Sequence, residues 1–155
     1  MKTILLSLSF SLTILTAFQS HGDLADLKQS KLKHGVVLVA GKVAPNVGQQ
    51  VVALGKTTKF TIFFQSPDAG QVLAVRQAAN KAGLLGEQVF VEQSGLDRIC
   101  LGDNVVDLAL VRGVKEKELL RVLRPGAEAM LADKKFIKPV MKGADSWSHP
   151  FHGPD

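Results

Sequence analysis

The sequence predicts an α/β domain with a mostly parallel β-sheet. Short, continuous apolar runs resemble buried strands, and segments with helical apolar spacing lie between them. The chain has 155 residues, which suffices for one domain with a hydrophobic core and is too short for two ordinary domains. Its 46% hydrophobic and 21% charged residues are typical of a globular protein.

The strands are expected where apolar residues follow one another without alternation. Such runs are typical of strands buried on both faces, as in parallel sheets. The expected strands are 35–40, 59–64, 88–92, 105–111 and 128–131, with an antiparallel strand returning over 135–140. The prediction is therefore a sheet of about five strands with a possible antiparallel edge strand.

Helices are expected between the strands, over 46–54, 69–85 and 114–123. Asn46 is placed to cap the first helix and Gly55 to end it, while Asp68 is placed to cap the second and Gly86 to end it. The third helix is expected to break at Arg124-Pro125-Gly126. Alternating strands and helices imply right-handed βαβ units.

In such a sheet, ligands bind beyond the carboxyl ends of the strands. The segments expected to form a site are therefore 40–46, 65–68, 92–97 and 111–114.

The N-terminus has the pattern of a secretory signal peptide. Lys2 is the only charge before Asp23, and the run Ile4–Phe18 is apolar apart from Ser and Thr. This run is shorter than the ~20 residues that a spanning helix needs, which favours cleavage over an uncleaved anchor. Residues 1–22 are therefore predicted to be a signal peptide. The mature chain is expected in the periplasm or outside the cell, without a stable membrane span.

Charge and composition argue against a nucleic-acid partner. Without residues 1–22 the chain has 18 basic and 14 acidic residues, a mild excess typical of a solvated basic face. Aromatic residues make up 6% and tyrosine is absent, so a base-stacking platform is not expected. The basic residues noted in the C-terminal half are Lys115, Lys117, Arg121, Arg124, Lys134, Lys135 and Lys138. They are interpreted as a solvated face, with contact to an anionic surface as the alternative.

Cys100 is the only cysteine, which excludes an internal disulfide and a C-x-x-C metal site. Its neighbours Ile99 and Leu101 favour a packed small residue over a reactive thiol. His34, before the first strand, is expected on the surface.

Three segments resemble class I S-adenosylmethionine-dependent methyltransferases. Residues 104–111, NVVDLALV, are similar to the family's fourth strand, and residues 118–126, ELLRVLRPG, to the following helix and the start of the fifth strand. Gly126 matches the first glycine of the family's glycine pair, and Ala127 replaces the second. Residues 78–84, AANKAGL, are similar to the end of the second helix. The resemblance covers about residues 35–132 and implies a Rossmann-like fold with S-adenosylmethionine as cofactor.

The C-terminal segment resembles an interdomain junction. Residues 145–155, DSWSHPFHGPD, are similar to a D-x-W-x-H-x-x-H-D pattern in large exported bacterial proteins. Those proteins have a signal peptide, a methyltransferase-like domain and a propeller similar to quinoprotein dehydrogenases. The resemblance divides the chain into a signal peptide, a lead-in over 23–34, a methyltransferase-like domain over 35–140, and a linker over 141–155. The implied partner is the propeller, in a longer protein or as a separate chain.

The spacing of His149 and His152 also suggests a metal site as an alternative. Two histidines underfill a zinc shell, and the nearby carboxylates are limited to Asp145 and Asp155. A linker is favoured, and no metal is expected.

The methyl donor requires three features of this fold, and the resemblance places each on a segment of this chain. The glycine-rich turn after the first strand corresponds to Ala40-Gly41-Lys42-Val43-Ala44-Pro45, in which one glycine remains. The acid that binds ribose at the end of the second strand corresponds to Gln65. The polar residue near adenine falls at Gly95 or, with a shorter loop, at Asp97. The candidate cofactor-binding residues are Ala40, Gly41, Lys42, Gln65 and Asp97.

These departures favour a degenerate methyltransferase-like domain that serves an exported protein as a non-catalytic binding or scaffolding module. The first alternative is an active class I methyltransferase with an unusual donor-binding loop. The second is a nucleotide- or sugar-binding module that uses the same strand ends. No catalytic residue is identified from the sequence.

Overall fold

The computed structural model describes residues 24, 32–43, 46–131 and 134–140. The predicted signal peptide and the predicted linker over 141–155 lie outside these residues. The strands are β1 His34–Ala40, β2 Lys59–Ser66, β3 Val89–Gln93, β4 Val106–Val111, β5 Leu123–Leu131 and β6 Lys134–Ile137. The helices are α2 Val47–Thr57, α3 Ala69–Lys81 and α4 Glu116–Val122.

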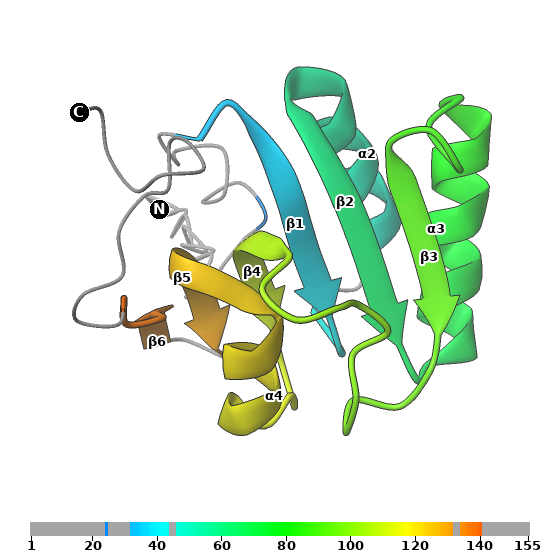
Figure 1. The fold of residues 1–155 in the computed structure, drawn as a ribbon. Helices are drawn as coiled ribbons and strands as arrows, with labels where there is room; N and C mark the ends of the chain where they lie inside the picture. The colour runs from blue at the N-terminus through cyan, green and yellow to red at the C-terminus, as the bar shows by residue number, and fades with distance from the viewer. Residues whose placement is uncertain (1–23, 25–31, 44–45, 132–133, 141–155) are drawn as a thin grey trace, which may run out of the picture.

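The six strands form one sheet in the order β3-β2-β1-β4-β5-β6 (Figure 1). The first five strands are parallel to their neighbours, and β6 pairs with β5 in the antiparallel direction. The predicted Rossmann-like fold, with its antiparallel edge strand, is confirmed. The order reverses between β1 and β4, which makes the carboxyl ends of these two strands the switch point at which such sheets bind ligands.

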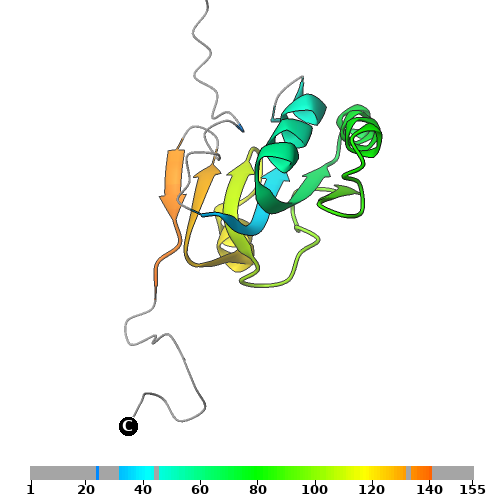
Figure 2. The same cartoon turned by 90° about the horizontal axis from the view of Figure 1, so that it is seen from above.

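Two hydrophobic cores lie on opposite faces of the sheet, and Figure 2 shows α2 and α3 on one side with α4 on the other. Because successive side chains of a strand point to opposite faces, Val37 and Val39 join the first core while Leu38 and Ala40 join the second. Both cores need apolar side chains from the same strands, and this explains the continuous apolar runs in the sequence. Leu24, in the predicted lead-in, is buried in the first core.

Helix α3 ends earlier than predicted, at Lys81 rather than residue 85. Gly83 takes a φ of +70°, a left-handed conformation that favours glycine. Its N–H donates to the carbonyl of Asn80, and the N–H of Leu84 donates to the carbonyl of Ala79. This is a Schellman motif, in which Gly83 rather than Gly86 terminates the helix.

Helix α2 ends later than predicted, because Gly55 lies inside it rather than after it. A Cβ at Gly55 would come within 3.0 Å of Leu84 Cδ1, so glycine allows close packing there. Asn46 occupies the N-cap position, but its side chain makes no capping bond to the backbone. Its Oδ1 accepts from Gln50 Nε2 instead, so the predicted cap at Asn46 is wrong.

Strand β5 begins at Leu123, five residues before its predicted start. The helix is predicted to break at residues 124–126, and it does end before them, at Val122. These residues belong to β5, however, and not to a connecting loop. Gly126 takes a φ of +80°, and its N–H donates to the carbonyl of Lys138 beyond β6. The remaining strand and helix ends agree with the predictions or differ from them by at most three residues. No helix among the described residues is long and apolar enough to span a membrane.

The two N-cap positions provide a matched test of helix capping. Asp68 Oδ1 accepts from the N–H groups of Gly70 at 2.8 Å and Gln71 at 3.1 Å. We expect Asp68→Ala to lower the free energy of unfolding by about 1 kcal/mol, because two backbone donors lose their acceptor. Asn46→Ala should cost less, since its side chain caps no backbone group. Urea denaturation of both variants measures the difference, and equal losses would contradict the capping assignment.

Candidate functional site

The candidate site lies at the carboxyl edge of the sheet, where β1 and β4 meet. Ala40 is fully buried, and its carbonyl accepts from the N–H of Arg112. Gly41 follows with a φ of +87°, and a Cβ there would lie 1.9 Å from the carbonyl oxygen of Arg112. The glycine is therefore required by the chain's own backbone as it leaves β4. Lys42, next in sequence, is exposed.

Gln65 is fully buried at the end of β2, with none of its surface exposed. Its Nε2 donates to the carbonyls of Gly95 at 2.6 Å and Arg98 at 2.9 Å. Its Oε1 accepts from the N–H of Cys100 at 2.8 Å. Both ends of the amide are thus used by the segment that joins β3 to β4, here called the 94–105 loop. Gln65 presents no accessible acceptor to a ligand.

The 94–105 loop crosses from β3 to β4 without a helix, passing in front of β2 and β1 in Figure 1. Leu96 lies over the switch point. Its Cδ1 would be 3.3 Å from a Cβ at Gly41 and equally 3.3 Å from one at Gly113. Ile99 is buried in the second core, and Leu96 packs against that core. The loop's own apolar side chains therefore occupy space at the carboxyl ends of β1 and β4.

Helix α4 holds the loop from the other side. Glu118 Oε1 accepts from the N–H of Ile99 at 2.7 Å, and Arg121 donates to the carbonyls of Ile99 and Leu101. Arg121 also pairs with Glu118 at 2.6 Å and with Asp103 at 2.6 Å. The hydrogen bond from Arg121 holds the pKa of Glu118 below its ordinary value, and burial opposes this effect.

Asp97, the candidate near adenine, points to solvent on the outside of the loop. Its side chain is 87% exposed and pairs with Lys115 at 2.7 Å. The hydrogen bond from Lys115 lowers the pKa of Asp97. Ala40, Gly41 and Gln65 come together at the ends of β1 and β2, but Asp97 and Lys42 are exposed. Among the described residues, no group of three or more side chains has the makings of a metal site.

Cys100 and His34 both lie on the surface of the domain. Cys100 is exposed, which contradicts its predicted packing. Ile99 takes the buried position instead, and the backbone N–H of Cys100 donates to Gln65 Oε1. His34 is exposed, as expected, although it belongs to β1.

Four of the seven basic residues noted in the C-terminal half form ion pairs with nearby acids. The pairs are Lys115–Asp97, Arg121–Asp103, Arg121–Glu118, Arg124–Asp107 and Lys135–Glu128. This half of the described chain is therefore a mixed-charge surface.

Comparison with solved structures places the fold among methyltransferases. The chain is similar to a SAM-dependent methyltransferase from Aquifex aeolicus, with 26% identity and a TM-score of 0.57 over 72% of this chain and 64% of that one. It is also similar to the [4+2]-cyclase SpnF, with 23% identity and a TM-score of 0.58 over 70% and 43%. A third neighbour is geranyl diphosphate C-methyltransferase from Streptomyces coelicolor, with 13% identity and a TM-score of 0.57 over 70% and 42%.

This chain thus has a methyltransferase-like fold and spans less than two thirds of the length of each of these neighbours. No protein-family model and no curated protein matches the sequence.

The role of the Gln65 amide can be tested with Gln65→Glu. A carboxylate cannot donate to the carbonyls of Gly95 and Arg98, so we expect a loss of about 3 kcal/mol at neutral pH. Burial and the two carbonyls raise the pKa of the introduced carboxyl in the folded state. The variant's stability should therefore fall, relative to the wild type, as the pH rises above about 4.3, the unfolded pKa.

Gln77→Glu serves as the control, because Gln77 is exposed. Urea denaturation between acid and neutral pH measures both variants. A Gln65→Glu protein as stable as the control would show that the amide does not hold the loop.

The Glu118 contact predicts a second pH dependence. Because the folded pKa of Glu118 is lowered, its contribution to stability is present above the unfolded pKa and is lost as the pH falls through the folded value. Glu118→Gln should lose about 1–2 kcal/mol at neutral pH and show a flatter fall in stability below pH ~4.5. Thermal melts across this range, with the exposed Glu116→Gln as control, measure it. An unchanged acid slope would contradict the assignment.

Proposed function

We propose that the chain is a non-catalytic, methyltransferase-like binding or scaffolding module. The observation that carries this proposal is the state of Gln65. At the strand end where the family resemblance requires an acid for ribose, the chain has a neutral amide that is fully buried and bonded to its own loop. A ribose hydroxyl would have to displace these hydrogen bonds to reach it.

The remaining glycine of the donor turn supports the same reading. A glycine kept for a ligand would leave open space above its backbone. At Gly41 that space is taken by the carbonyl of Arg112, with Leu96 close by. The glycine is therefore explained by chain packing alone. These described residues do not fit S-adenosylmethionine.

Methyl transfer does not follow from the fold, because one fold serves many reactions. One of the structural neighbours is named as a [4+2]-cyclase rather than a methyltransferase. The identities are also low, and the chain spans only part of each neighbour. The function therefore depends on the residues at the carboxyl edge of the sheet and not on the fold alone.

The wider setting of the module belongs to the proposal. The pattern of residues 1–22 supports export, and a domain outside the cytoplasm would be separated from the place where S-adenosylmethionine is made. The pattern of residues 145–155 supports attachment to, or association with, a propeller domain. In that setting the domain's contribution is structural.

Calorimetry of the full chain with S-adenosylmethionine distinguishes the proposal from an active methyltransferase. We expect no binding heat at millimolar ligand and no change in melting temperature. A site with micromolar affinity would instead stabilise the fold by about 2.7 kcal/mol at 100 times its Kd. Saturable binding in the micromolar range would overturn the proposal.

The variant Leu96→Ala sharpens this experiment, since it removes the side chain that lies over Gly41. A variant that stays folded and still does not bind would show that loss of the acceptor at Gln65 is sufficient. Binding by the variant alone would show that the loop blocks an otherwise competent site. An active methyltransferase of the same fold is the positive control for the ligand.

A further inference from the structure

The positive charge of this chain is concentrated in its first half. Residues 27–67 contain six lysines and neither aspartate nor glutamate. From residue 68 to the end, twelve basic residues are matched by twelve acidic ones. The lysines of the acid-free stretch are Lys28, Lys31, Lys33, Lys42, Lys56 and Lys59.

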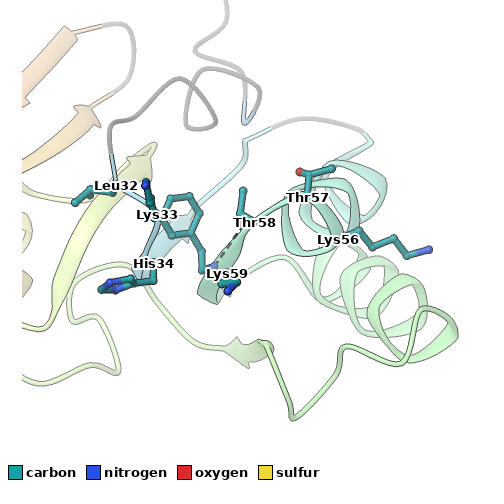
Figure 3. Close-up of a pocket in the computed structure, with 8 residues that line it drawn as sticks. Leu32, Lys33, His34, Lys56, Thr57, Thr58 and Lys59 are labelled. Carbon is teal, nitrogen blue, oxygen red and sulfur yellow. Dashed lines mark hydrogen bonds between the residues drawn. The ribbon is translucent and has the colours of Figure 1, made fainter.

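Three of these lysines surround one hollow at the amino edge of the sheet, the end opposite to the candidate site (Figure 3). The hollow has a volume of about 650 Å³. It is lined by Leu32, Lys33 and His34 at the start of β1, by Lys56 and Thr57 at the end of α2, and by Thr58, Lys59 and Phe60 at the start of β2. No acidic residue lines it.

The side-chain amines of these lysines have no partner among the described residues. No side-chain ion pair or side-chain hydrogen bond of Lys33, Lys56 or Lys59 occurs there, in contrast to the paired basic residues of the C-terminal half. Two carbonyls in the last turns of α2 accept hydrogen bonds from threonine side chains. Thr57 donates to the carbonyl of Ala53 at 2.7 Å, and Thr58 to the carbonyl of Leu54, also at 2.7 Å. Within the described part of the chain, no carboxylate therefore neutralises these three ammonium groups.

The arrangement of the side chains indicates the chemistry of that partner. In Figure 3 the lysines do not converge on one point, because the Lys56 side chain extends away from Lys33 and Lys59; this spread fits an extended anion better than a compact one. Leu32 is 42% exposed and adds an apolar surface to the hollow. No arginine, tryptophan or tyrosine lines the hollow and Phe60 is buried, so the exposed imidazole of His34 is the one ring in this lining that a base could stack on, and a platform for successive bases is missing.

We infer that this hollow, lined by Lys33, Lys56 and Lys59 with Leu32 at one end, is a docking surface for an acidic, partly apolar segment of a partner protein. The lysines attract carboxylates without demanding one geometry, as flexible point charges do. Leu32 provides contact for an apolar side chain between the carboxylates. This inference is independent of whether the carboxyl edge binds the methyl donor.

Fluorescence anisotropy of the full chain with a labelled peptide of alternating Glu and Leu residues tests the inference. We expect K33E/K56E/K59E to weaken binding by about tenfold or more, with a steeper loss at low salt. The matched control is K81E/K117E/K134E, which reverses three exposed lysines elsewhere and changes the net charge equally. It should weaken binding by no more than about twofold. Leu32→Ser should reduce the preference for the Glu-Leu peptide over an all-Glu peptide of the same length.

Thermal melts confirm that each variant is folded, and K33Q/K56Q/K59Q replaces the charge-reversed protein if that one unfolds. Equal losses in the two reversed triples would overturn the inference, because net charge alone would then explain binding. Absence of saturable binding to the Glu-Leu peptide would also overturn it. So would tighter binding of a heparin oligosaccharide or single-stranded DNA of equal charge, since the surface would then suit a polyanion rather than a protein segment.

Discussion

The buried amide of Gln65 joins the end of β2 to the loop that crosses the sheet. A polar side chain without solvent contact is tolerated only when its hydrogen bonds are made within the protein, and here the amide donates twice and accepts once. All three partners are backbone groups of the 94–105 loop. The position of Ile99 in the second core and of Leu96 above Gly41 depends on this loop conformation. One side chain thus links sheet, loop and core at the edge where a ligand would bind.

Helix α4 completes the same arrangement from the opposite direction. Glu118 and Arg121 bind the loop's backbone and each other, so the loop is fixed between β2 and α4. A polar network of this kind is stable when each member is satisfied, and it specifies one conformation. The polar groups of Gln65 and Glu118 thus bond to the 94–105 loop, whereas a ligand-binding edge would leave such groups free for the ligand.

The two ends of the sheet therefore differ in character. At the carboxyl edge, where α/β proteins usually bind ligands, Leu96 lies close to Gly41 and Gly113, and internal hydrogen bonds hold the 94–105 loop. The amino edge has a hollow with an exposed leucine and three lysines whose side chains have no ion pair among the described residues. If the domain acts as a scaffold, the amino edge is the surface on which a partner can be recognised. The methyltransferase-like fold then persists as a stable support for that surface.

The sequence by itself determined the parallel sheet, because strands buried on both faces must be apolar throughout, as residues 35–40 and 105–111 are. It also determined the cap at Asp68, since capping is a local interaction. The acid-free stretch 27–67 is also visible in the sequence, and it supplies the three lysines that line the hollow at the amino edge. Only the tertiary structure decided where Gln65 and Cys100 point and why Gly41 is a glycine. Their contacts come from residues 30 or more positions away, and local sequence spacing does not encode such contacts.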